Sequence, residues 1–80
     1  MKKSQSLPIY MDMYQDIKKK IADEVYPVGA FLPTEAQLQE TYRVSRTTVR
    51  RAVAKLQEDG LIKVKQGFGT QILQRKISQS

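Results

Sequence analysis

The segment "SRTTVRRAVAKLQEDG", residues 45–60, contains signals for the start, the body and the end of a helix. Ser45 suits the N-cap, because its hydroxyl can accept a hydrogen bond from a first-turn backbone amide. Gly60 suits the position just after the last turn. The i, i+3, i+4, i+7 spacing of a single buried stripe is shared by Val49, Ala52, Val53 and Leu56. The segment therefore predicts an amphipathic helix over residues 45–59.

The opposite side of this helix carries arginine and threonine. At about 100° per residue, the residues that face away from the stripe are Thr47, Arg50, Arg51 and Ala54. Arg46 lies between the two sides, in the first turn. An arginine fork matches the O6 and N7 acceptors of guanine, and a threonine methyl can contact the thymine methyl. First-turn amides, with the hydroxyls of Ser45 and of Thr47 or Thr48, can hold phosphates. These features predict a helix that enters the major groove of DNA.

A short helix is expected immediately before it. "TEAQ", residues 34–37, has the form of a capping box, in which Thr34 accepts from the Gln37 amide and Gln37 reaches back. This helix should cover residues 34–41, with Leu38 inward. The brief link "YRVS" then joins two consecutive helices, and the second one has a basic first turn. This is the pattern of a helix-turn-helix.

A longer helix is expected at the start of the chain, over residues 8–24. Its apolar residues fall at helical spacing and are Ile9, Met13, Ile17 and Ile21. Pro8 suits a first-turn position. The segment "VYPVGAFLP", residues 25–33, contains two prolines and a glycine, which predict a loop. We expect its Val28, Phe31 and Leu32 to pack on the core.

A β-hairpin is expected after the amphipathic helix. Ile62 and Val64 alternate with Lys63 and Lys65, which predicts a strand whose apolar residues close the core and whose lysines project. Residues 66–69 form a turn, and residues 70–73 form a second strand. The predicted fold is α+β: a winged helix-turn-helix with three helices and a two-stranded wing over residues 61–73.

The turn "QGFG" contains G-x-G, which also occurs in nucleotide-binding loops. Such a loop needs a strand before it and a helix after it, whereas a strand follows here. The glycines therefore suit a wing tip that approaches a sugar-phosphate backbone closely. The sequence leaves two possibilities for Phe68: it packs inward as a small anchor, or it stays exposed at the tip.

Composition excludes several kinds of chemistry. The chain of 80 residues has no cysteine and no histidine, so zinc sites built on Cys and His and nucleophile–histidine pairs are ruled out. Asp23–Glu24 and Glu58–Asp59 are adjacent acid pairs, which we interpret as solvated helix-end residues rather than catalytic groups. No apolar run approaches the roughly 18 residues of a membrane span, and "MKKSQSLP" lacks the apolar core of a signal peptide. We expect a soluble cytoplasmic protein that is not an enzyme and has no cofactor and no metal.

The net charge of +6 is unevenly distributed. Residues 1–42 hold five Lys or Arg and six Asp or Glu, a net charge of −1. Residues 43–80 hold nine and two, a net charge of +7. The basic half predicts a polyanionic partner.

Taken together, residues 7–73 resemble the N-terminal winged-helix domain of the GntR family of bacterial transcription regulators, most closely its HutC-type branch. The resemblance rests on L-P-[ST]-E at residues 32–35, V-S-R-x-T-V-R-x-A at residues 44–52 and G-x-G-T at residues 67–70. It implies sequence-specific binding to DNA, usually by a repressor that acts as a dimer on a palindromic operator. It also implies that Arg46 reads a base, that Arg50 contacts a base or phosphate, and that Gly67 borders the minor groove.

The residues predicted to bind DNA come from the helix expected over residues 34–41, the helix over residues 45–59 and the wing over residues 61–73. They are Thr34, Glu35, Ser45, Arg46, Thr47, Thr48, Arg50, Arg51, Lys65, Gln66, Gly67 and Gly69. One position departs from the family, because many members have arginine where this chain has Ala36. The family also continues into a C-terminal domain that binds an effector and dimerises, whereas this chain stops, either as a truncated piece or as a stand-alone domain. The domain is expected over residues 7–74, between a disordered tail at 1–6 and a tail or linker at 75–80. A winged helix used for protein docking or for RNA binding is the alternative function.

Overall fold

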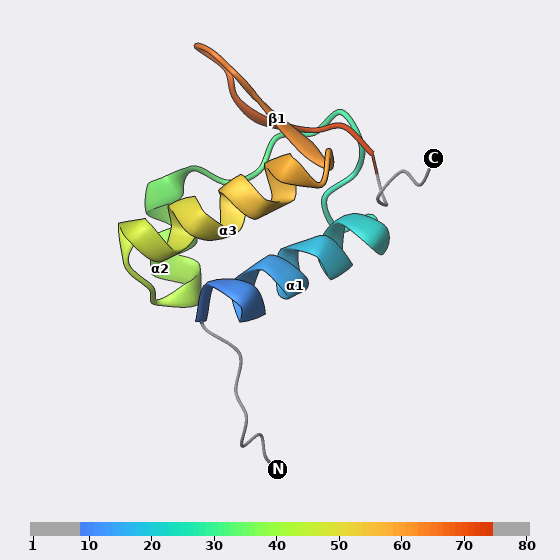
Figure 1. Cartoon of the computed structure of the whole chain (residues 1–80). Coiled ribbons are helices and arrows are strands. Elements are labelled where there is room, and N and C mark those ends of the chain that lie inside the picture. The colour runs from blue at the N-terminus through green and yellow to red at the C-terminus, as the bar shows by residue number, and fades with distance from the viewer. Residues whose placement is uncertain (1–8, 75–80) are drawn as a thin grey trace.

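The computed structural model describes residues 9–74, and it shows three helices followed by a two-stranded antiparallel sheet (Figure 1). The elements are α1 Ile9–Ala22, α2 Glu35–Tyr42, α3 Arg46–Glu58, β1 Ile62–Lys65 and β2 Gly69–Ile72. The winged helix-turn-helix fold is therefore confirmed. Pro8 and the expected tails at 1–6 and 75–80 lie outside the described residues. No helix within residues 9–74 is long and apolar enough to cross a membrane.

The first helix ends two residues earlier than expected. Glu24 has a φ of 62°, which is the left-handed region, so the helical path cannot continue through it. The amides of Asp23 and Val25 still donate to the carbonyls of Lys19 and Lys20, each at 2.8 Å. These hydrogen bonds satisfy the last carbonyls of α1 while the chain turns toward the loop.

Caps at both ends of α2 and at the start of α3 define where the two helices begin and end. The capping box that begins α2 is present: Thr34 Oγ1 accepts from the Gln37 amide at 3.1 Å, and the Thr34 amide donates to Gln37 Oε1 at 2.8 Å. The helix ends at Arg43, which adopts a left-handed conformation with a φ of 56° and donates its amide to the Gln39 carbonyl. Two residues later, Ser45 Oγ accepts from the Thr48 amide at 3.2 Å and begins α3. Only residues 43–45 therefore separate the two helices, which keeps the end of α2 close to the start of α3.

The core lies where α1, α2, α3 and the base of the wing meet. Its most deeply buried side chains are Ile17, Ile21, Leu38, Val49, Leu56, Leu61, Ile62 and Ile72. Val49, Ala52 and Leu56 confirm the predicted stripe of α3, whereas Val53 is only partly buried. Among residues 9–74, no polar or charged side chain is buried, so burial of apolar surface is the main stabilising contribution to this fold.

At the base of the wing, β2 is hydrogen-bonded on both of its sides. In the hairpin, Ile62 faces Ile72 and Lys65 faces Gly69. On the other side of β2, the loop before α2 runs alongside: the Leu32 amide donates to the Thr70 carbonyl at 2.8 Å, and the Ile72 amide donates to the Ala30 carbonyl at 2.8 Å. Beyond this base the hairpin projects away from the helices (Figure 1). The pairing of residues 29–32 with β2 was not predicted from the sequence.

Three side chains expected in the core are instead exposed. Val28 is 53% exposed, Phe31 42% and Val64 52%. Ile62 and Val64 share one face of β1, but only Ile62 packs into the core, whereas Val64 borders the open groove toward α2 and α3. Phe31 belongs to the edge segment that pairs with β2, and its ring lies beside Gly69 rather than in the core. Leu32 is buried as expected.

Two tyrosine hydroxyls attach α1 to the other helices. The Tyr42 hydroxyl donates to Asp16 at 2.6 Å and accepts from Lys20 Nζ at 3.3 Å. The Tyr14 hydroxyl donates to Asp59, just past the end of α3. Burial is the main cause that raises the pKa of each tyrosine to about 12, and the carboxylate partner adds to it. Both phenols therefore remain hydrogen-bond donors throughout the physiological range.

The bond from Tyr42 lowers the pKa of Asp16 below its ordinary value of 3.8. Because the folded chain holds this carboxylate ionised to a lower pH than the unfolded chain does, its contribution to stability is complete above the ordinary pKa. That contribution is lost as the pH falls through the lowered pKa.

We expect the free energy of unfolding of Asp16→Asn to decrease less than that of the wild type between neutral pH and a pH below 3.8. Urea unfolding followed by circular dichroism measures this difference, with Asp12→Asn as the exposed control on the same helix. Equal pH dependence in the wild type and Asp16→Asn would contradict the expectation.

Candidate nucleic-acid interface

The first residue of α2 contacts the exposed side of α3. Glu35 Oε1 lies 3.4 Å from Arg46 Nε, and Glu35 Oε2 lies 3.3 Å from Arg50 Nε. Each carboxylate oxygen thus holds one arginine, and the two arginines lie one turn apart on the same side of α3. The structure therefore brings together three of the predicted DNA-binding residues.

The two arginines are held but remain open to solvent. The Arg46 side chain is 65% exposed and the Arg50 side chain 62% exposed. Glu35 engages each of them through Nε, whereas a fork made by the two Nη atoms is sufficient to bind guanine O6 and N7. An arginine can therefore keep its contact with Glu35 while it contacts a base. Such a contact limits the conformations of a long side chain before a ligand arrives.

The hydroxyls at the start of α3 are partly committed to the cap. Ser45 Oγ accepts from the Thr48 amide and donates its proton to Thr48 Oγ1 at 3.0 Å. Of the two hydroxyl groups in this cap, the Thr48 hydroxyl therefore still has a proton to donate to a phosphate oxygen. Thr47 is exposed, on the side of α3 that carries Arg50 and Arg51.

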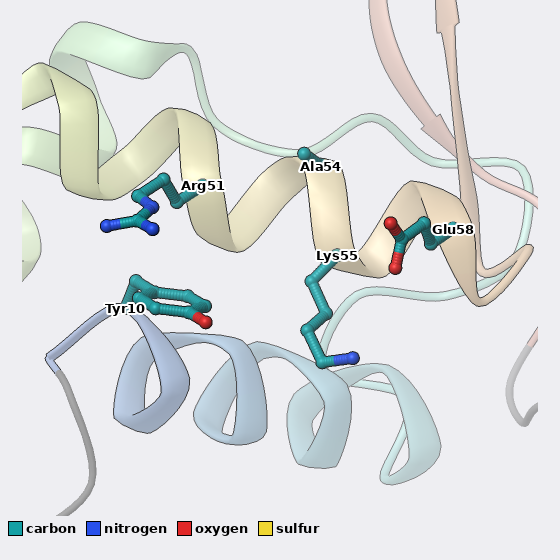
Figure 2. Close-up of a pocket in the computed structure, with 5 residues that line it drawn as sticks. All are labelled: Tyr10, Arg51, Ala54, Lys55 and Glu58. Carbon is teal, nitrogen blue, oxygen red and sulfur yellow. The ribbon is translucent and has the colours of Figure 1, made fainter.

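The structure places Arg51 away from Arg46 and Arg50. Its guanidinium carbon lies 4.8 Å from the centroid of the Tyr10 ring, so this side chain extends toward α1 (Figure 2). Lys55, one turn further along, lies on the same side, with Nζ 5.2 Å from the centroid of the Tyr14 ring. Lys55 was missing from the predicted set, although its i+4 spacing from Arg51 already indicated a shared side.

The wing tip is a tight turn whose side chains point outward. The Phe68 amide donates to the Lys65 carbonyl at 2.9 Å, which closes the turn. Gly67 has a φ of 85° and no heavy atom within 4 Å of where a Cβ would lie. This position needs glycine for its backbone conformation and not for lack of space. Phe68 is 77% exposed, so the outward orientation is the one that the structure adopts.

A groove of about 520 Å³ connects the wing with the helix-turn-helix. Its walls include Glu35 and Arg50 from the helices and Val64, Phe68 and Thr70 from the wing. Arg50 and the wing therefore lie on the same flank of α3, and the groove brings together Thr34, Glu35, Arg50 and Gly69 of the predicted residues. Arg51 lies on the other flank.

Residues 9–72 match the family model described as bacterial regulatory proteins, gntR family. The chain belongs to the GntR family. Among GntR relatives, it is 40% identical over 74 residues to the uncharacterized HTH-type transcriptional regulator YurK of Bacillus subtilis, covering 92% of this chain and 31% of that protein. It is 39% identical over 69 residues to the probable transcriptional regulator PhnF of Escherichia coli, covering 82% and 29%. The chain thus spans less than a third of the length of these curated relatives.

Solved structures of similar proteins have the same architecture. A GntR family transcriptional regulator from Listeria monocytogenes superposes with a TM-score of 0.81 at 30% identity, covering 89% of this chain and 62% of that one. The DNA-binding domain of AraR, in complex with operator ORE1, superposes with a TM-score of 0.82 at 32% identity, covering 90% and 89%. The GntR winged-helix fold is therefore established by sequence and by structure.

We expect Glu35→Gln to change the free energy of unfolding by less than about 1 kcal/mol, because exposed ion pairs contribute little to stability. The same change should increase the nanosecond mobility of the Nε–H groups of Arg46 and Arg50, since their shared anchor is lost. Nitrogen-15 relaxation of the arginine side chains measures this motion, and Arg51, stacked on Tyr10, is the internal control. Unaltered mobility of Arg46 and Arg50 would show that Glu35 does not restrain them.

Proposed function

We propose that this chain binds double-stranded DNA sequence-specifically as the DNA-binding domain of a transcription regulator. In this proposal α3 lies in the major groove, and the wing over residues 61–73 lies against the backbone and the minor groove. The observation that carries the proposal is the pair Arg46 and Arg50, held by Glu35 on the exposed side of a capped helix. AraR domains that superpose on this chain were solved with operator DNA, which supports the same ligand here.

The charge distribution supports the proposal independently. Residues 43–80, the part of the chain that includes α3 and the wing, carry a net charge of +7. When the exposed lysines of β1 and arginines of α3 neutralise phosphates, DNA releases its bound counterions. The affinity for DNA should therefore fall steeply as the salt concentration rises. In the proposed complex, phosphates are held by the hydroxyls of Thr34, Thr47 and Thr48, by the first turn of α3 that Ser45 caps, and by the wing residues Lys65, Gln66, Gly67 and Gly69.

The properties of the longer regulator are also proposals. We propose a HutC-type repressor that works in the cytoplasm, pairs as a homodimer on a palindromic operator, and responds to an effector through a C-terminal domain. We assign no enzymatic activity to this domain, since the similar proteins are named as transcriptional regulators. Ala36, where many members have arginine, removes one contact from α2 and relaxes one operator position.

We expect Arg46→Ala to weaken binding to the preferred site by roughly 1–3 kcal/mol and to relax base preference, because a bidentate base contact is lost. Lys65→Ala should weaken binding to all sequences evenly and reduce the salt slope by about 0.9, since only a phosphate contact is lost. A selection from a random DNA pool gives the site, and fluorescence anisotropy over a range of salt concentrations measures both effects. Lys19→Ala on α1 is the control.

The wild type decides between function classes in the same experiment. Absence of salt-dependent binding to the selected duplex would refute DNA binding. Binding to a protein or an RNA that is insensitive to Arg46 and Arg50 would favour a docking module instead.

We expect the 80-residue chain to be monomeric or weakly dimeric in solution and to pair on DNA, because the winged helix matched over residues 9–72 takes up most of it. Light scattering with and without the selected palindrome measures the mass of each species. One protomer per full palindrome at saturation would contradict pairing on DNA.

A further inference from the structure

A second cationic surface lies between α3 and α1, on the flank of α3 that faces away from the wing (Figure 2). We name it the α1-side cluster, and it consists of Tyr10, Arg51 and Lys55. Together with Ala54 and Glu58, these side chains line a hollow of about 330 Å³. Arg51 is among the residues predicted to bind DNA, but it does not line the groove beside the wing, and Tyr10 and Lys55 were not predicted.

Aromatic rings hold the cations of this cluster in place. Arg51 lies over the Tyr10 ring at 4.8 Å, and Lys55 lies over the Tyr14 ring at 5.2 Å. Lys18 approaches Tyr14 from α1 at 5.5 Å and adds a third positive charge nearby. The face of an aromatic ring attracts a cation, and an arginine stacked on a ring still presents the N–H groups of its edge to a ligand. The cluster is therefore both positively charged and ordered.

The position of the cluster indicates which part of a duplex it faces. Arg50 and the wing share one flank of α3, whereas Arg51 extends toward α1 on the other flank and lies over the Tyr10 ring. A helix in the major groove lies between two sugar-phosphate walls that are about 12 Å apart. The flank with Arg50 faces the wall nearer to the wing, so the flank with Arg51 faces the opposite wall.

We propose that Tyr10, Arg51 and Lys55 form a second phosphate-binding site, which holds the DNA backbone on the side of α3 away from the wing. This inference rests on the proposed function. Arg51 and Lys55 contact phosphate oxygens, and the Tyr10 ring is the positioning group that keeps Arg51 in place. The site adds affinity and orientation without base preference, because phosphates carry no sequence information.

Two carboxylates limit the extent of this site. Glu58 lies farther along α3 than Lys55 (Figure 2) and lines the same hollow. Asp59 follows it and accepts from the Tyr14 hydroxyl. A phosphate is therefore expected at the Arg51 end, and Glu58 opposes its approach. Removal of the Glu58 charge should strengthen binding to every duplex.

The salt dependence of DNA binding tests the site. Anisotropy titrations use two duplexes of equal length, one with the sequence selected from a random pool and one of unselected sequence. Arg51→Gln and Lys55→Gln should each reduce the slope of log K against log salt by about 0.9 on both duplexes, with base preference unchanged. Lys19→Gln, an equal change of charge on the outer side of α1, should leave the slope nearly unchanged. Glu58→Gln should raise affinity on both duplexes.

Substitutions at Tyr10 separate positioning from a general effect on folding. Tyr10→Leu should reproduce part of the loss seen with Arg51→Gln, because the ring beneath the guanidinium is gone. Tyr10→Phe keeps the ring and should bind as the wild type does. Arg51→Lys keeps the charge and should keep most of the slope, which guards against loss of folding as the cause. Thermal unfolding of each variant accompanies the titrations.

Each result has a definite meaning. Unchanged slopes for Arg51→Gln and Lys55→Gln, while Arg46→Ala still weakens the selected site, would overturn this inference and leave the proposed function intact. A loss confined to the selected duplex would make Arg51 a base contact and also overturn it. Absence of salt-dependent binding by the wild type would refute the proposed function together with this site.

Discussion

The turn at residues 43–45 is the constraint on which the rest of the interface depends. Arg43 accepts a left-handed conformation, which costs a residue with a Cβ roughly 1 kcal/mol. The hydrogen bonds from Arg43 and Val44 to the Gln39 carbonyl and the cap at Ser45 offset this cost. With only three residues between α2 and α3, the start of α2 lies against the exposed side of α3. Glu35 can reach both Arg46 and Arg50 for that reason.

The acids and bases of the interface have separate functions on the two flanks of α3. On the flank toward the wing, Glu35 anchors two arginines that remain more than half exposed. On the flank toward α1, aromatic rings hold Arg51 and Lys55, and Glu58 is the acid nearby. A carboxylate lowers the net charge of the group that it forms with its arginines, whereas an aromatic ring adds no charge of its own. In the proposed complex, base contacts come from Arg46 and Arg50, and phosphates are held on both flanks, by the wing on one side and by Arg51 and Lys55 on the other.

Local signals predicted most of the fold, and long-range contacts account for what was missed. The caps at Thr34 and Ser45 and the stripe of α3 depend on neighbours within one or two turns, so spacing alone revealed them. The exposure of Val64 depends on the open groove that it borders, and that of Phe31 on its pairing with β2. Neither is written in the alternation of residues. Likewise, the sequence assigned Arg51 to the exposed side of α3, but only packing against α1 shows that it stacks on Tyr10.

The double pairing of β2 gives the wing uneven mechanical properties. At its base, β2 is hydrogen-bonded to β1 on one side and to residues 29–32 on the other. Toward the tip, only the hairpin and the turn closed by Phe68 remain. The wing should thus be more rigid near Ile72, where β2 has two neighbours, than near Gly67 at its tip. In the proposed complex, the tip of the wing can bend to follow minor grooves of different widths, while the core keeps α3 in place.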